Sequence, residues 1–206
     1  MAIRLAGLTG ATLETTPTVC HECVWWQSRA RPVNKHRWIE RVEENWGAWG
    51  TIYYDDDGEV LGSMQYGPSQ LFPRGAELPA GPPSEDAVLV TCVYLVERAS
   101  PWVLQSLFLA AIGEAKDKGA AALETFAYRF PEGETAYERF QVHKTAFPRD
   151  FLSDFGFSTV RTAGRVELVR LELGGLQPVA EGSRQKVLRL VREAFFPQPM
   201  PQPRRP

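Results

Sequence analysis

Two cysteines near the N-terminus have a spacing that could hold a metal ion or form a redox pair. Cys20 and Cys23 enclose His21 and Glu22, and thiolate and imidazole are ligands that tetrahedral zinc prefers. A second pair of ligands at matching spacing is missing, and Cys92 lies in an apolar run. The motif also does not open a helix after a strand, as a thioredoxin-like redox motif would. We therefore favour a pair of small apolar cysteines that pack beside Trp25 and Trp26, and we expect no metal site.

Five of the six tryptophans fall within the first fifty residues, at positions Trp25, Trp26, Trp38, Trp46 and Trp49. Aromatic walls can line a pocket for an amine or an aromatic ligand. More often such residues fill a core, and we favour the core.

Glu124 is a carboxylate within an otherwise apolar stretch, Ala121 to Tyr128. A strand carboxylate near an amine could remove its proton directly or through water. The alternative is an ordinary polar residue on a solvent-facing position of a strand.

The elements that must position these side chains are clearest in the middle of the chain. The nearly continuous apolar run Ala87 to Val96 predicts a central strand covered on both faces. Ser100 and Pro101 are typical of a helix start, and Gly119 ends the apolar pattern that follows. A strand over 121–128 then completes a strand–helix–strand unit with parallel strands.

The flanking segments predict antiparallel strands and short helices. We expect an α/β fold with a mixed sheet. Its further strands are expected over 3–8, 46–54, 60–66, 157–161 and 165–173. Helices are expected over 33–44, with Pro32 at the start, and over 151–155. Asp55 to Gly58 predicts a hairpin turn, and segments 9–18 and 67–84 read as irregular. An amphipathic helix over 184–196 and a proline-rich tail over 197–203 follow.

Composition limits the classes of function. The chain has 206 residues, 44% of them hydrophobic, and a formal charge of -2 with both signs mixed along it. That suits one domain and argues against a nucleic-acid binder, which needs a basic face. No apolar run is long enough to cross a bilayer, there is no signal-peptide pattern, and three cysteines do not make a disulfide framework. We expect a cytoplasmic protein.

Several segments together resemble the GNAT N-acetyltransferases. They are the hairpin at Asp57-Gly58, the run Leu89 to Leu95, the helix through Ala115, the strand Ala122 to Phe126 and the segment Phe151 to Phe157. The resemblance covers roughly residues 46–173. The order and spacing of the segments carry it rather than any single motif.

The resemblance implies how a cosubstrate, acetyl-CoA, would bind. A central strand separates from its neighbour, and its backbone, here at Val93 and Leu95, pairs with the pantetheine arm. The next helix directs its amino end at the pyrophosphate, which implies Arg98, Ser100 and Val103 as further binding residues.

The sequence departs from the family pattern at the phosphate loop and at the acid. The family has a basic or amide residue and two glycines where this chain has Ala99, Trp102 and Leu104, and Pro101 has no amide hydrogen to donate. The tyrosine that many members use to protonate the leaving thiolate aligns with Leu152. Tyr128 or Tyr137 could replace it, although no spacing requires either.

Two functions therefore stay open. The first is an acetyl-CoA-dependent N-acetyltransferase that acts on a small-molecule or peptide amine, with Glu124 as the base. The second is a degenerate member that binds a ligand or protein without turnover. We expect a GNAT-like domain over 1–175 with its core at 46–173, a helical extension over 176–196 that could recruit a second copy or another protein, and a disordered tail over 197–206.

Overall fold

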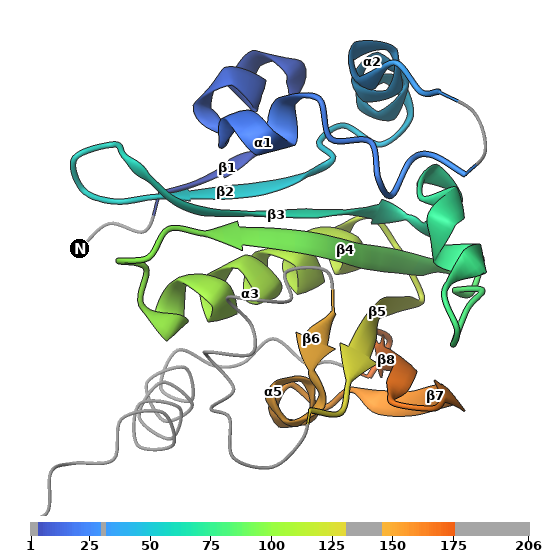
Figure 1. The fold of residues 1–206 in the computed structure, drawn as a ribbon. Helices are drawn as coiled ribbons and strands as arrows, with labels where there is room; N and C mark the ends of the chain where they lie inside the picture. Colours follow the sequence, from blue (N-terminus) through green and yellow to red (C-terminus); the bar gives the residue numbers. More distant parts are fainter. Residues whose placement is uncertain (1–3, 30–31, 131–145, 176–206) are drawn as a thin grey trace, which may run out of the picture. The chain divides into compact units, whose positions relative to one another are not determined.

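The computed structural model describes residues 4–29, 32–130 and 146–175 (Figure 1). Its strands form one mixed eight-stranded sheet in the order β1-β2-β3-β4-β5-β8-β7, with β6 paired to β5. This confirms the expected α/β class. The strands are β1 (Arg4–Gly7), β2 (Gly50–Tyr54), β3 (Val60–Pro68), β4 (Ala87–Leu95), β5 (Ala122–Tyr128), β6 (Phe147–Pro148), β7 (Ser158–Ala163) and β8 (Val166–Glu172).

Helices cover both faces of the sheet. They are α1 (Thr18–His21), α2 (Lys35–Asn45), α3 (Pro101–Asp117) and α5 (Arg149–Asp154). Figure 1 shows α1 and α2 on one side of β1 to β4 and α3 on the other side. The core on the α2 side includes Trp26, Trp38, Trp49, Ile52, Leu89 and Phe126. The preference for tryptophans as core material is therefore correct for these three, whereas Trp25 is exposed.

The helix α2 begins two residues later than the sequence suggested. Its N-cap is Asn34, whose side chain accepts a hydrogen bond from the Arg37 amide at 3.0 Å. The asparagine side chain accepts a hydrogen bond from a free amide at the helix start, which a proline side chain cannot do. The helix ends before Gly47, which has a φ of 96°, so β2 starts at Gly50 and not at Trp46.

The turn between β2 and β3 matches the prediction. One carboxylate oxygen of Asp55 accepts hydrogen bonds from the amides of Asp57 at 3.0 Å and Glu59 at 2.9 Å. Gly58 supplies the positive φ, 86°, that the turn needs. We call residues 55–59 the β2–β3 turn.

The central strand–helix–strand unit is also as expected. Strands β4 and β5 are parallel, and α3 connects them from N-cap Ser100 and Pro101 at its first position. Gly119, with a φ of 74°, follows the end of the helix. The Ser100 side chain makes no capping hydrogen bond.

Three segments differ from the sequence reading in detail. Gly10–Thr15 forms a 3₁₀ helix, and the long loop before β4 contains two more, Ser69–Leu71 and Pro73–Glu77. The last helix starts at Arg149. The predicted C-terminal helix and tail lie outside the described residues, and no helix within the described ranges is long and apolar enough to cross a membrane.

Candidate functional site

A β-bulge interrupts β4 in its middle. On β3, Gln65 pairs with Cys92 and Tyr66 pairs with Val90, which leaves Thr91 as one extra residue on β4. The Thr91 hydroxyl donates to the Gln65 backbone oxygen at 3.1 Å and lies 3.0 Å from the side-chain oxygen of the same residue. A bulge of this kind bends its strand and increases the local twist.

Pairing between β4 and β5 ends at the bulge. The recorded register runs from Ala87 with Ala122 to Val90 with Thr125, whereas β4 stays paired with β3 as far as Leu95. The Thr125 hydroxyl donates to the Val90 oxygen at 2.9 Å at the last pair. Beyond it the two strands separate (Figure 1), and we call the space beside residues 91–95 the β4–β5 gap.

The backbone of two predicted binding residues faces this gap. The Val96 amide donates to the Leu61 oxygen on β3 at 3.1 Å. Successive residues of a strand direct their amide and carbonyl groups to opposite edges. Leu95 and Val93 therefore direct theirs away from β3, toward the gap, while their side chains are buried.

The start of α3 lies directly against the end of β4, because Gly62 on β3 has no side chain. A Cβ at Gly62 would lie 2.6 Å from a Leu95 methyl carbon, 2.9 Å from the Tyr94 oxygen and 3.2 Å from a Val103 methyl carbon. Gly62 thus lets the first turn of α3 pack closely against β3 and the end of β4. Sequence reasoning missed it, and the only signal was a glycine inside a strand pattern.

The polar groups expected to bind a cosubstrate at the start of α3 already make some contacts within the protein. Arg98, 63% exposed, forms an ion pair with Asp55 of the β2–β3 turn at 3.3 Å. The Val103 amide donates to the Ser100 oxygen at 2.9 Å, and Pro101 has no amide hydrogen. The first turn can therefore offer a ligand at most the amides of Ser100 and Trp102. Leu104, at a family glycine position, is buried.

Glu124 lies beside the closed part of the β4–β5 pair, opposite Leu89. Its side chain is 0% exposed, so the alternative of a solvent-facing residue is wrong. One carboxylate oxygen accepts from the Ser84 hydroxyl at 2.7 Å and from Arg170 at 3.1 Å, and the other accepts from the Ser84 amide at 2.8 Å. The burial has a simple cause, because the loop before β4 folds over this end of β5.

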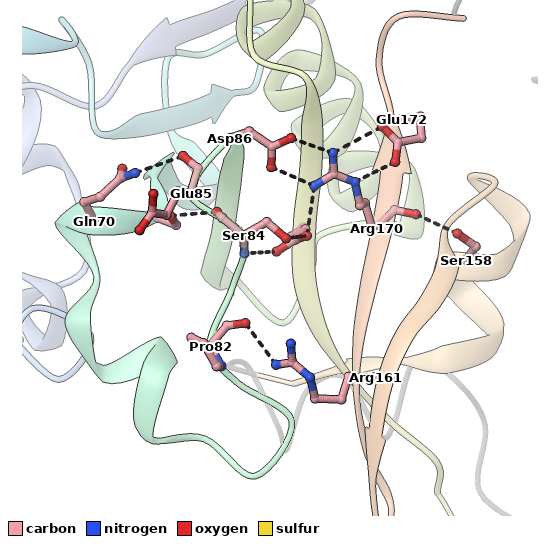
Figure 2. A network of polar contacts seen from close by, with 11 residues as sticks. Gln70, Pro82, Ser84, Glu85, Asp86, Ser158, Arg161, Arg170 and Glu172 are labelled. Carbon is pink, nitrogen blue, oxygen red and sulfur yellow. Dashed lines mark hydrogen bonds and ion pairs between the residues drawn. The ribbon is translucent and has the colours of Figure 1, made fainter.

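Arg170 extends this network to the surface. Figure 2 shows its guanidinium between Asp86 and Glu172, with Ser84 nearby. Arg170 pairs with Asp86 at 3.0 Å and with Glu172 at 2.6 Å, and its hydrogen bond to Asp86 lowers the pKa of that carboxyl. Arg161 donates to the backbone oxygens of Ala80 at 3.0 Å and Pro82 at 3.1 Å. Two arginines of the β7–β8 hairpin thus fasten residues 80–86 to the sheet.

The position of the family's acid holds a buried leucine. Leu152 is 0% exposed and belongs to α5, where Phe151 packs on Phe108 of α3 with ring centroids 5.4 Å apart. A leucine cannot transfer a proton. Tyr128 ends β5 and is partly buried, and Tyr137 lies outside the described residues.

A buried lysine on the α2 side was not singled out from the sequence. Lys35 is 4% exposed, and its ammonium lies 4.9 Å from the Trp38 ring and 4.6 Å from the Trp49 ring. It donates to the Cys23 oxygen at 3.1 Å. Burial lowers its pKa, an effect that the thiols of Cys92 and Cys23 oppose. The signal was its place one turn before Trp38 in the apolar stripe of α2.

None of the three cysteines forms a disulfide, and each is close enough to Lys35 to act on its charge. Burial raises the pKa of Cys92 to about 12. Within the described ranges, no three side chains of His, Cys, Asp or Glu group closely enough to hold a metal ion.

No protein-family model matches the sequence, and no curated protein matches it. Solved structures do match the fold. The PaiA N-acetyltransferase from Thermoplasma acidophilum, in complex with coenzyme A, is similar with a TM-score of 0.51 and 16% identity over 84% of this chain and 99% of that one. An N-acetyltransferase from Staphylococcus aureus Mu50 has a TM-score of 0.50 and 15% identity over 84% and 99%. The chain therefore has the fold of the GNAT acetyltransferases.

Proposed function

We propose that this protein is an acyltransferase that holds the pantetheine arm of an acetyl-CoA-type thioester in the β4–β5 gap and transfers the acyl group to an amine. The observation that carries the proposal is the bulge at Thr91. Pairing with β5 stops there, and the amide and carbonyl groups of Val93 and Leu95 face the gap. A pantetheine arm has two amide groups, so it can hydrogen-bond to this edge as a short extra strand would.

The residues fit the arm of the donor better than its nucleotide. The arm needs a strand edge, and β4 provides one. The pyrophosphate needs several amides or cations, whereas Pro101 lacks an amide hydrogen and Arg98 pairs with Asp55. We therefore assign the phosphates no role in the acyl transfer.

The transfer needs position more than specialised chemistry. The amine nitrogen attacks the thioester carbonyl carbon, the C–N bond forms as the C–S bond breaks, and the sulfur leaves with the bonding electron pair. The proton lost by the amine finally protonates the thiolate sulfur, which gives a free thiol. Holding both reactants together is sufficient for a large part of such a rate acceleration.

Glu124 is a poor candidate for the base in this step. Its two carboxylate oxygens already accept three hydrogen bonds, from Ser84 and Arg170. It also lies beside the paired part of β4, before the gap opens. We assign it a structural role and propose that water removes the amine proton.

A protein that binds without turnover is the second candidate. It is favoured by the buried leucine at position 152 and by the side chains of Trp102 and Leu104 at the start of α3. The two candidates share the gap and differ in whether a thiol is released.

Calorimetric titration of the full chain with acetyl-CoA and, separately, with acetyl-pantetheine tests the proposal. Binding of either ligand supports it, and a bound ligand should raise the melting temperature. Release of free thiol with a panel of primary amines then supports the transferase, and binding without release supports the second candidate. If neither ligand binds at millimolar concentration, the proposal is wrong.

A matched pair of variants locates the site. Leu95→Pro removes an amide that faces the gap and leaves the β3 ladder intact, because proline is tolerated where the amide is not paired. Leu95→Ala loses the same buried side chain and keeps the amide. We expect Leu95→Ala to bind as the wild type does and Leu95→Pro to bind at least about tenfold more weakly, the free energy of one good hydrogen bond.

A further inference from the structure

The end of the sheet at which β4 leads into α3 is acidic. The β2–β3 turn carries Asp55, Asp56, Asp57 and Glu59, and all but Asp55 are exposed. The ion pair of Arg98 with Asp55 ties this turn to the segment that leads into α3. Figure 1 shows the turn and the start of α3 at the same end of the sheet.

This charge disfavours a polyanion at the start of α3. Glu97 is exposed beside Arg98, and Arg4 of β1 lies opposite the last residue of β2, at the start of the turn. Among the described residues of this region, carboxylates therefore outnumber arginines. Exposed charges act over about 10 Å at ordinary ionic strength, and Arg98, which pairs with Asp55, lies three residues before Pro101, the first residue of α3. A nucleotide donor would bring its pyrophosphate and its 3′-phosphate into this field.

The helix start supplies little to offset that repulsion. Pro101 has no amide hydrogen, and the Val103 amide is turned to the Ser100 oxygen. The gap itself differs, because it offers neutral backbone groups of Val93 and Leu95. The charge and the donors of this end of the molecule therefore suit a neutral amide chain and do not suit a nucleotide.

We propose that the acyl donor is a thioester whose pantetheine arm carries no nucleotide, so that recognition is confined to the arm. This rests on the proposed function and names the donor class of the same site. The acyl carbon leaves the pantetheine sulfur for the amine nitrogen, and the arm departs as a free thiol with the proton that the amine loses.

Titration of the full chain with three donors tests the proposal. Acetyl-pantetheine has no phosphate, acetyl-phosphopantetheine has one, and acetyl-CoA has the nucleotide. We expect Kd to stay equal or to rise along this series, and we expect added salt to tighten acetyl-CoA without changing acetyl-pantetheine, because salt screens the acidic turn. Thiol release separates the two sources of such an arm. Release from acetyl-phosphopantetheine free in solution indicates a small-molecule donor, and release only when the arm is attached to an acyl carrier protein indicates a carrier-bound donor.

A charge variant and its matched control sharpen the test. Asp56→Asn, Asp57→Asn and Glu59→Gln together remove three charges beside α3 and keep Asp55, which holds the turn. We expect this variant to bind acetyl-CoA about threefold or more tightly than the wild type does and acetyl-pantetheine with unchanged Kd, since surface charges are worth fractions of a kcal/mol each. The control removes three exposed charges elsewhere, with Glu40→Gln, Glu44→Gln and Asp117→Asn, and should change neither.

Two results are decisive and differ from each other. A wild-type Kd for acetyl-CoA tenfold or more below that for acetyl-pantetheine overturns this proposal and leaves the acyltransferase proposal standing. Failure of all three donors to bind overturns both.

Discussion

The two halves of β4 have the same kind of sequence and different surroundings. Residues 88–90 pair with both β3 and β5, whereas residues 92–95 pair with β3 alone. Beside the first half, a charged network of Glu124, Ser84 and Arg170 fixes the loop over the sheet. Beside the second half, the backbone groups of Val93 and Leu95 have no pairing with β5. One extra residue, Thr91, separates a half that builds the fold from a half that could bind a ligand.

The difference indicates where the chain's chemistry should be sought. The closed half holds the buried carboxylate that looked catalytic in the sequence, and its oxygens are occupied. In the open half, the groups directed toward the gap are the backbone amides and carbonyls of Val93 and Leu95. In the closed half, charged side chains stabilise the fold, whereas in the open half we expect backbone groups to bind the ligand. Variants in each half test this difference.

The largest expected effect is at Glu124. Glu124→Gln removes the buried charge that faces Arg170 and places an NH2 group against the Ser84 amide, which loses its acceptor. Removal of one charge from a buried charged pair costs about 3 kcal/mol of unfolding free energy. Urea unfolding at pH 7 measures it. Glu172→Gln is the control, since Glu172 also contacts Arg170 but is 67% exposed, and it should cost under about 0.5 kcal/mol. If Glu124→Gln kept full stability and lost thiol release, Glu124 would be the base and the comparison would fail.

The next effect is at Gly62, in the open half. In Gly62→Ala the new Cβ would lie 2.9 Å from the Tyr94 backbone oxygen, which cannot move freely. Overpacking of this kind costs about 2 kcal/mol, and displacing the start of α3 should also weaken donor binding. Gly113→Ala in the same helix has open space around its Cβ and should gain roughly 0.5 kcal/mol. Wild-type donor affinity in Gly62→Ala would show that the position of α3 does not matter to the gap.

The smallest effect is the pH dependence contributed by Lys35. Burial lowers the pKa of Lys35 below its ordinary value of 10.5, so between the folded pKa and 10.5 the unfolded chain binds more protons. The stability of the wild type relative to Lys35→Met should therefore rise with pH in that window and stay level below it. Thermal unfolding from pH 6 to 10 measures the difference, in which other titrating groups largely cancel. Lys116→Met, at an exposed position, should show no such slope, and parallel curves for Lys35→Met and the wild type would contradict the assignment.

Much of the frame could be predicted from the sequence. The run of β4, the proline-led start of α3 and the hairpin turn at Asp55 each depend on local patterns, and each is found in the structure. The environments of Glu124 and Arg98 could not be predicted. Their partners, Arg170 and Asp55, are 46 and 43 residues away in the chain, so only the folded sheet brings them together.

The bulge at Thr91 and the burial of Lys35 could not be predicted for a different reason. An extra residue in an apolar strand leaves no mark on the pattern, because Thr91 is as buried as its neighbours. Lys35 lies in register with the stripe of α2, but lysine is rarely found fully buried. In both places the tertiary environment overrides the usual preference of the residue type.

The short strand β6 makes the β4–β5 gap asymmetric. On the edge of β5 away from β8, β4 covers residues 122–125 and β6 covers Ala127 and Tyr128, so Phe126 is the only β5 position between them. β6 itself consists of Phe147 and Pro148, both buried. The Phe147 ring packs on Phe108 of α3 with ring centroids 5.0 Å apart, so β6 fastens this part of the sheet to the helix. A guest chain could therefore pair along β4 beyond Val90, but on β5 it would find only Phe126 without a strand partner on this edge.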